Sequence, residues 1–119
     1  MSKIVKGKLG EDLAVKYLQD IGYTVIERNW RYSRLGEIDI IAKNNNQLVF
    51  IEVKTRTSAF FGEPIEAITP SKIKKIYKLA EVYLSENTLP NDLGCRFDAV
   101  SVILRKTPEI IHHEDIYCG

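Results

Sequence analysis

Apolar and polar side chains alternate through residues 36–56, the sequence GEIDIIAKNNNQLVFIEVKTR, with the two-residue period of β-strands. The alternation runs up to three asparagines at positions 44–46 and resumes after them. Asparagine tolerates the positive φ angle that tight connections need. The pattern therefore predicts two strands joined by an asparagine turn, and we expect this hairpin to be the centre of the fold.

A second periodicity, of three to four residues, predicts a helix on either side of that hairpin. The first helix is expected over residues 7–21, and Gly22 follows where a C-terminal glycine belongs. The second is expected to open at residues 69–71, since Thr-Pro-Ser suits a capping turn. The apolar stripes are Leu9, Leu13, Ala14, Tyr17, Leu18 and Ile21 in the first helix and Ile73, Ile76, Tyr77, Ala80, Tyr83 and Leu84 in the second.

Further strands are expected at residues 23–32, 95–104 and 109–117, the last at an edge of the sheet. Residues 57–69 form a connection whose Phe60 and Phe61 either touch substrate or pack under the sheet. No repeat or linker divides the 119 residues, which are enough for one sheet and its helices. We therefore expect a single domain over residues 1–119.

Composition narrows the class of protein without identifying it. With 45% hydrophobic and 28% charged residues the chain is typical of a globular protein, and a net charge of +1 does not by itself indicate nucleic acid. No apolar run approaches the ~20 residues of a membrane span, and the N-terminus lacks the apolar core of a signal peptide. Cys95 and Cys118 lack the spacing of a zinc site or redox pair. We expect a cytoplasmic protein with free thiols and no membrane partner.

Candidate chemistry lies on the hairpin. Glu52 and Lys54 share one face of their strand, about 6.6–7 Å apart, and Asp39 joins them if the two strands align. Carboxylate oxygens suit Mg²⁺ or Mn²⁺, and a nearby lysine stabilises charge that develops on a phosphate. The alternative is a half-exposed hairpin with a polar outer face, in which Lys54 only pairs with Glu52. Ile41 and Phe50 share the carboxylate face, which indicates that this face is covered and favours a site.

Three other groups of residues carry weaker signals. Glu11 lies early in the first helix, and from the local sequence alone it is a first-turn acid favoured by the helix dipole. The lysines within residues 72–78 form either a solvated face or a contact for phosphates. His112 and His113 face opposite ways if they lie on a strand, so both cannot reach one ion without a bulge. We interpret the histidines as surface or edge residues.

The chain also resembles known families. Glu11 in a helix, then Asp39, then the tripeptide EVK at 52–54 resemble the signature of the PD-(D/E)xK restriction-endonuclease-like superfamily, although Ile38 replaces the proline of that motif. The segments KGKLGEDLAVKYL, GYTVIERNWR, GEIDIIA, FIEVKTR and RFDAVSV together resemble the uncharacterised bacterial YraN-like family over nearly the whole chain. YraN-like proteins are similar to archaeal Holliday junction resolvases. The resemblance implies an α/β fold with a restriction-endonuclease-like mixed β-sheet, flanked by helices, in the order α-β-β-β-α-β.

The same resemblance implies roles for particular residues. Asp39 and Glu52 match metal ligands, which the backbone carbonyl of Val53 would join, and Lys54 matches the catalytic lysine. Glu11 matches a helix glutamate that supports the metal through water or a second ion. The implied cofactor is Mg²⁺ or Mn²⁺. The implied activity is a metal-dependent endonuclease that hydrolyses DNA phosphodiester bonds, with branched or damaged DNA as candidate substrates.

Two classes of function remain open at this point. The first is that nuclease, with nucleic acid as its partner and backbone phosphates contacted by Arg31, Arg56, Lys72 and Lys75. The second is a non-catalytic module of the same fold that binds nucleic acid or a protein. Resolvases act as dimers because a junction needs two coordinated cuts, so a homodimer is an option, but no residue pattern here identifies a dimer surface. The intact set of carboxylates and lysine favours the nuclease.

Overall fold

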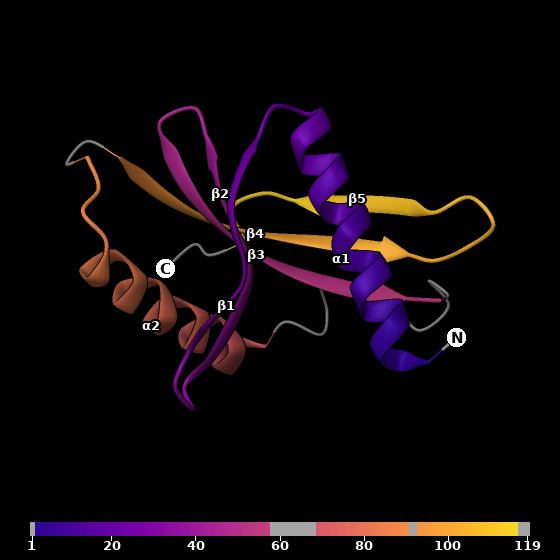
Figure 1. Ribbon diagram of the computed structural model, residues 1–119, viewed down its shortest axis with the longest axis horizontal. Coiled ribbons are helices and arrows are strands. Elements are labelled where there is room, and N and C mark those ends of the chain that lie inside the picture. The colour runs from indigo at the N-terminus through magenta and orange to yellow at the C-terminus, as the bar shows by residue number, and fades with distance from the viewer. Residues whose placement is uncertain (1, 58–68, 91–92, 117–119) are drawn as a thin grey trace.

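One mixed five-stranded sheet carries a helix on each face (Figure 1). The computed structural model describes residues 2–57, 69–90 and 93–116. The elements along these residues are α1 (Lys3–Asp20), β1 (Thr24–Tyr32), β2 (Gly36–Asn44), β3 (Gln47–Arg56), α2 (Pro70–Glu86), β4 (Gly94–Ile103) and β5 (Glu109–His113). The predicted mixed α/β fold is confirmed, and β5 follows the predicted α-β-β-β-α-β core as an edge strand.

The strands lie side by side in the order of the sequence, from β1 to β5. Neighbouring strands are antiparallel except β3 and β4, which are parallel from the pair Gln47↔Gly94 to the pair Arg56↔Ile103. A parallel pair needs a crossover connection, and α2 lies in that connection. The predicted hairpin is confirmed, because β2 and β3 meet at a turn in which Asn45 has φ +54°.

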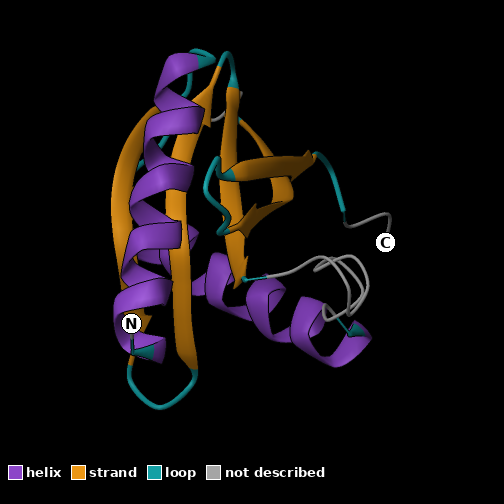
Figure 2. Cartoon of the chain, turned by 90° about the vertical axis from the view of Figure 1, so that its right-hand side faces the viewer, coloured by secondary structure: helices purple, strands orange, loops and turns teal. Residues whose placement is uncertain are grey.

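Strand β3 is the centre of the core because both of its faces are buried. Val49 and Ile51 belong to a cluster completed by α1, whereas Leu48 and Phe50 belong to a cluster completed by α2. Figure 2 shows α1 running alongside the strands over most of their length. Each large apolar side chain buried in this way contributes roughly 1.5–3 kcal/mol. The charged residues from Glu52 onward therefore extend from a strand whose position is fixed.

Helix α1 begins at Lys3, earlier than the predicted start at residue 7. Ser2 caps the helix, and its hydroxyl oxygen accepts a hydrogen bond from the backbone N–H of Val5 at 3.1 Å. This start places Glu11 in the third turn, beyond the reach of the dipole at the helix N-terminus. The interpretation of Glu11 as a first-turn acid is therefore wrong.

The stripe that α1 buries is also displaced from the predicted one. Its buried residues are Gly10, Ala14 and Leu18. Leu9 and Ile21, at the ends of the predicted stripe, are exposed. Gly22 follows the helix with φ +101°, a conformation open to glycine, so the predicted end of the helix is confirmed. In this part of the helix, Gly10 and not Leu9 therefore faces the sheet.

Helix α2 begins as predicted and buries a slightly different face. Thr69 is the N-cap, its hydroxyl accepts a hydrogen bond from the first turn, and Pro70 opens the helix. Leu79 is fully buried although the predicted stripe omitted it. Tyr77 and Leu84, which that stripe included, are exposed. The central residues of the stripe are therefore confirmed and its borders are not.

Beyond the end of the β2–β3 pairing, β1 and β2 continue as a two-stranded ribbon. Ile38 and Ile40 would share one face of a regular strand, yet Ile40 packs in the α1 cluster and Ile38 packs in the α2 cluster. On β1, Asn29 lies opposite this point with φ +53°. The ribbon therefore changes face at Asn29 and Asp39, and Asp39 lies beside β3 just where the ladder has ended.

The structure tests only part of what the sequence predicts for the connecting segment, the cysteines and a membrane span. Phe60 and Phe61 of the predicted connection lie outside the described residues, as does Cys118. Cys95 is a free, exposed thiol. Over the described part of the chain, neither helix has the length and apolar character needed to cross a membrane.

The contact between α1 and β3 generates a prediction for stability. A Cβ atom at Gly10 would lie 2.0 Å from the Thr55 Oγ1 atom, so Gly10→Ala should push α1 away from β3 and destabilise the protein by about 1–3 kcal/mol. A Cβ atom at Gly7 would meet nothing within 4 Å, so the control Gly7→Ala should stabilise the helix by roughly 0.5–1 kcal/mol. Urea denaturation measures both changes. Equal effects of the two substitutions, or a penalty that persists in a Thr55→Gly background, would contradict this contact.

Candidate functional site

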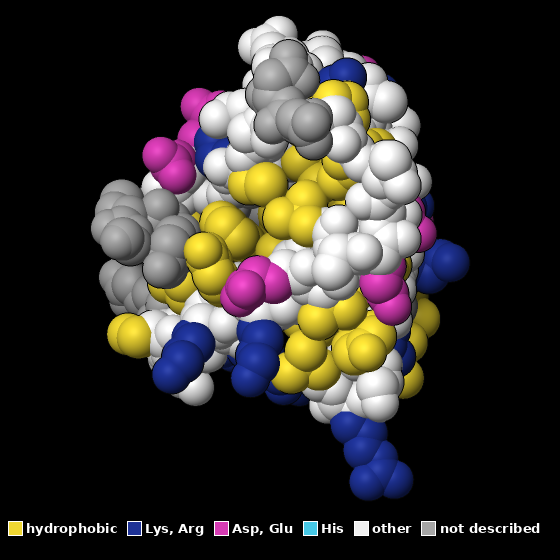
Figure 3. Space-filling model, turned by 90° about the vertical axis from the view of Figure 1, so that its left-hand side faces the viewer, with side chains coloured by type: hydrophobic (Ala, Val, Ile, Leu, Met, Phe, Trp, Pro, Cys, Tyr) yellow, Lys and Arg dark blue, Asp and Glu magenta, His cyan; other side chains and the backbone are white. Residues whose placement is uncertain are grey.

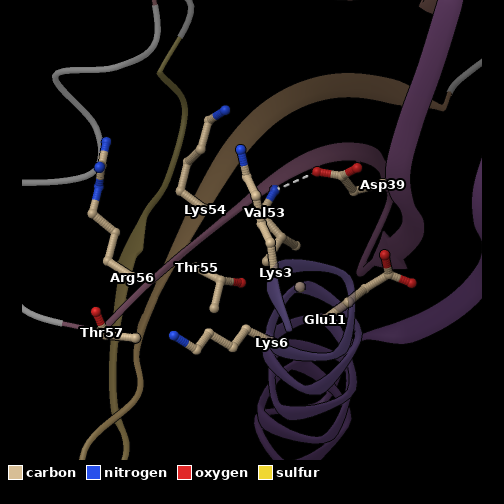
Figure 4. A pocket seen from close by; sticks show the side chains of 10 residues that line it. Lys3, Lys6, Glu11, Asp39, Val53, Lys54, Thr55, Arg56 and Thr57 are labelled. Atoms are coloured by element: carbon tan, nitrogen blue, oxygen red, sulfur yellow. Dashed lines mark hydrogen bonds between the residues drawn. The ribbon is translucent and has the colours of Figure 1, made fainter. Parts of the chain in front are cut away.

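A cleft of about 600 Å³ opens between the N-terminal half of α1 and the C-terminal half of β3. Its lining consists of Lys3, Lys6, Gly7, Glu11, Asp39, Val53, Lys54, Thr55, Arg56 and Thr57. Figure 4 shows the carboxylates of Asp39 and Glu11 on one side of this space and the side chains of Lys6, Lys54 and Arg56 on the other. The cleft therefore combines a pair of carboxylates with several fixed positive charges.

Asp39 occupies the point where β2 and β3 separate. Their pairing ends at Ile40↔Ile51, and a further rung would join Ile38 to Val53. The Asp39 carboxylate takes that place and accepts a hydrogen bond from the Val53 backbone N–H at 2.8 Å. The N–H and C=O of one strand residue point to the same side, so the Val53 carbonyl also faces this gap. A carboxylate and a backbone carbonyl thus share one small opening.

Burial and neighbouring acids make this carboxylate unusual. Burial raises the pKa of Asp39 to about 7, and the negative charges of Glu52, Glu11 and Glu37 add to the effect, against the hydrogen bond from Val53, which lowers it. Burial and repulsion therefore outweigh the hydrogen bond from Val53. A cation in the gap would relieve both the desolvation and the repulsion.

Glu52 and Lys54 form the ion pair that the structural alternative requires. The Lys54 Nζ atom lies 3.4 Å from the Glu52 Oε1 atom, and both side chains are mostly buried. Lys54 also lines the cleft, whereas Glu52 is not among the described residues that line it. Glu52 acts on Asp39 through its charge. The predicted Asp39, Glu52 and Lys54 are therefore brought together, with Glu52 set behind the cleft wall.

Glu11 is held by strand β1. Its Oε1 atom accepts hydrogen bonds from Arg28 Nε at 3.0 Å and from Asn29 Nδ2 at 2.9 Å. Arg28 also pairs with Asp12 on the same helix. Asn29 is the residue at which the ribbon changes face, so one backbone irregularity places both Asp39 and the partner of Glu11. The Glu11 carboxylate is thereby fixed in the wall of the cleft.

The four predicted phosphate contacts divide between two places. Arg56 lines the cleft, and the nearby amino group of Lys54, together with desolvation, lowers the pKa of Lys72 in α2. Arg31 pairs with Glu37 at 3.4 Å on the ribbon, and Lys75 lies against Gly36 at the tip of the same ribbon. These four side chains therefore do not form a single patch.

The prediction missed two basic residues of the cleft, Lys3 and Lys6. Both belong to the part of α1 that precedes the predicted start of the helix. The signal that could have found them is Ser2, a favoured N-cap residue just before a lysine-rich stretch.

A second polar cluster lies on the α1 face of the sheet. Asp98, His112 and Glu114 place their ligand atoms within 4.8 Å of one another, an arrangement that could hold a metal ion. His112 lies on the edge strand β5, as one of the two interpretations required, but its side chain is only 7% exposed, so it is not a surface residue. Its Nε2 atom lies 2.8 Å from Asp98 and its Nδ1 atom lies 3.0 Å from the hydroxyl of Tyr17.

The oxygens of Asp98 in this cluster already have several donors. Arg96 donates from Nε at 2.9 Å and from a terminal nitrogen at 3.1 Å, and the Asp115 backbone N–H and the Tyr23 hydroxyl donate as well. Burial alone would raise the pKa of Asp98, but the hydrogen bonds from His112 and Arg96 outweigh it and hold that pKa below its ordinary value. A cation in this cluster would compete with the Arg96 guanidinium for the oxygens of Asp98.

Comparison with known proteins identifies relatives without a stated function. A family model described as uncharacterised protein family UPF0102 matches residues 10–102, a segment that contains Glu11, Asp39, Glu52 and Lys54. A UPF0102 protein of Clostridium botulinum (strain Hall) is 52% identical over 98 residues, which cover 82% of this chain and 79% of that protein. A UPF0102 protein of Acetivibrio thermocellus is 42% identical over 115 residues, which cover 97% of this chain and 88% of that protein.

The raised pKa of Asp39 generates a prediction for stability against pH. The folded state holds the Asp39 proton more tightly than the unfolded state, so metal-free stability should fall as pH rises from about 4 to about 7 and stay lower above that. Asp39→Asn keeps an acceptor for Val53 and removes the charge. It should stabilise the metal-free protein at pH 8 by at most about 4 kcal/mol and change little at pH 4.

Denaturant unfolding in EDTA, at pH 4 and at pH 8, measures this change in the free energy of unfolding. Asp20→Asn, a change at an exposed acid paired with Lys16, is the matched control and should shift stability by less than about 0.5 kcal/mol. A loss of stability in Asp39→Asn at pH 8 would show that the Asp39 charge is paired in the fold and would contradict the electrostatic account.

Proposed function

Since the chain belongs to the uncharacterised protein family UPF0102, we propose its function from the geometry of the cleft: a metal-dependent endonuclease that hydrolyses DNA phosphodiester bonds with Mg²⁺ or Mn²⁺. The observation that carries the proposal is the gap between β2 and β3, where the Asp39 carboxylate and the Val53 carbonyl face one opening beside Lys54. Hard oxygen ligands on rigid strands suit both ions.

The residues of this chain fit such an ion. Asp39 and the Val53 carbonyl would hold it, Glu52 would act through its charge on Asp39, and Glu11 would support it from α1. The chemistry of the donors supports this assignment, because burial and repulsion penalise the charge on Asp39 until a cation offsets it. When bound, the ion supplies Lewis-acid stabilisation of the charge on a phosphate.

The basic side chains have a separate part in the reaction. Lys3, Lys6 and Arg56 line the cleft and would neutralise backbone phosphates on either side of the bond that is cut. Lys54 lies closest in sequence to the proposed ligands, and its compact ammonium would stabilise charge that appears in the transition state. Lys72 lies near Lys54 and would add positive charge at the same place when it is protonated.

Two further considerations support a nuclease. The order of Glu11, Asp39, Glu52 and Lys54 resembles the signature of the PD-(D/E)xK superfamily, and a five-stranded mixed sheet with two helices is compatible with that fold. The proposal includes DNA, and branched or damaged DNA in particular, as the substrate. It also includes action as a homodimer. A cytoplasmic location, where DNA is accessible, is proposed with it.

One observation favours a second function. The 3.4 Å ion pair between Glu52 and Lys54 satisfies both charges without any ligand. A module that binds nucleic acid or a protein without turnover would retain such a pair for structure. The nuclease and the binding module differ in the effect that removal of the Lys54 side chain would have on DNA cleavage and binding.

Cleavage assays separate them. Wild-type protein with Mg²⁺ or Mn²⁺ should cut at least one of a panel of linear, single-stranded, flapped and four-way DNA substrates, and Lys54→Ala should slow cleavage by about 10²–10³-fold. Binding of DNA should change far less, because the interaction is made mainly in the transition state. Lys43→Ala, at an exposed lysine toward the other end of β2, is the matched control and should retain full activity.

A melting curve accompanies each variant, because Lys54→Ala leaves the Glu52 carboxylate unpaired. Lys54→Arg keeps a positive charge for the ion pair without the compact ammonium, so it should fold well and remain slow. Wild-type rates from a well-folded Lys54→Ala protein would refute the catalytic role. Metal-independent binding of DNA with no cleavage of any substrate would favour the binding module.

A further inference from the structure

The tip of the β1–β2 ribbon carries an aromatic column that the proposed nuclease site does not use. Tyr32 is 40% exposed, and its ring stacks on Trp30 with centroids 6.2 Å apart and 16° between the planes. The Trp30 ring meets Tyr83 of α2 edge to face at 5.3 Å. Tyr83 is buried in the α2 cluster. The column therefore runs from the core to the surface, and its outermost ring is held at a fixed angle.

Basic residues also lie at the tip of the ribbon. Arg31 is exposed beside Tyr32, although it pairs with Glu37 at 3.4 Å, and Arg34 is exposed in the turn. Lys75 of α2 packs against Gly36, the residue paired with Tyr32 across the ribbon. Lys and Arg side chains line the lower edge of the face in Figure 3. In Figures 1 and 2 the tip of the ribbon extends below both helices.

The column lies at a defined distance from the cleft. Strand β2 leads from Gly36 at the tip to Asp39 in the cleft, and three residues of strand span about 10 Å. A nucleic-acid strand covers that distance in about three base steps, at 3.4 Å per step. The column packs on the α2 side of the sheet and the cleft opens on the α1 side, so a strand whose phosphate lies in the cleft would pass round the edge of the ribbon to bring a base to Tyr32.

We propose that the tip of the β1–β2 ribbon stacks an unpaired base on Tyr32, so that the substrate is a nucleic acid with a single-stranded segment a few nucleotides from the bond in the cleft. This inference rests on the proposed function. A ring that is half exposed and fixed by a second ring offers one free face to a base. Bases inside a duplex are already stacked and cannot use that face. The neighbouring arginines and Lys75 would follow the backbone.

Trp30 gives a direct readout of this contact because it is the one tryptophan of the chain. In EDTA, where no cleavage occurs, a titration with single-stranded oligo(dT) should change Trp30 fluorescence and saturate at lower concentrations than a blunt duplex of equal length. Tyr32→Ala should weaken the binding of oligo(dT) by about 5- to 100-fold, and Tyr32→Phe should retain it. Tyr77→Ala, at a tyrosine of α2 that is 43% exposed and stacked on Phe97, is the matched control and should have no effect.

The outcomes separate this inference from the nuclease itself. If wild-type protein cleaves DNA but Tyr32→Ala, with an unchanged melting temperature, binds oligo(dT) as tightly as wild type, the stacking role is refuted and the proposed function stands. If binding depends on Tyr32 but no substrate is cleaved with Mg²⁺ or Mn²⁺, the stacking role stands and the nuclease is refuted. If oligo(dT) does not bind, or binds no better than the duplex, the inference is overturned. If no form of DNA binds, both are overturned.

Discussion

The hydrogen bond from the Val53 backbone N–H to the Asp39 carboxylate is the interaction on which the site depends. It replaces the rung that β2 and β3 would otherwise form, and so it satisfies a buried donor while opening the sheet. The same replacement puts a carboxylate where solvent is scarce and where Glu52 is close. Backbone pairing, burial and the raised pKa of Asp39 are consequences of one local arrangement.

The rest of the fold supports that arrangement from two sides. Gly10 lets α1 approach Thr55 of β3 closely, and the next residue of the helix is Glu11. From the other side, Asn29 bends the ribbon and donates a hydrogen bond to Glu11. The packing thus gathers acids around Asp39: Glu11 and Glu52 are paired with Arg28 and Lys54, whereas burial and these acids raise the pKa of Asp39. Such a cluster costs stability in the absence of a cation, which is typical of sites that trade stability for function.

The sequence predicted most of the local structure and only part of the site. Period-two alternation and the asparagine turn located the central hairpin, because these signals depend on neighbouring residues alone. The position of the Asp39 carboxylate could not be predicted, since it depends on where β2 leaves β3. The burial of the His112 side chain was missed for a similar reason, because its partners Asp98 and Tyr17 are distant in the sequence. Charges that interact over long separations leave no periodic pattern.

Anomalous scattering at the manganese edge, from crystals grown with Mn²⁺, tests the central claim most directly. The account predicts a peak between β2 and β3, within coordination distance of the Asp39 carboxylate and the Val53 carbonyl, and no such peak in Asp39→Asn. A peak among Asp98, His112 and Glu114, or no peak between β2 and β3 at millimolar Mn²⁺, would contradict it.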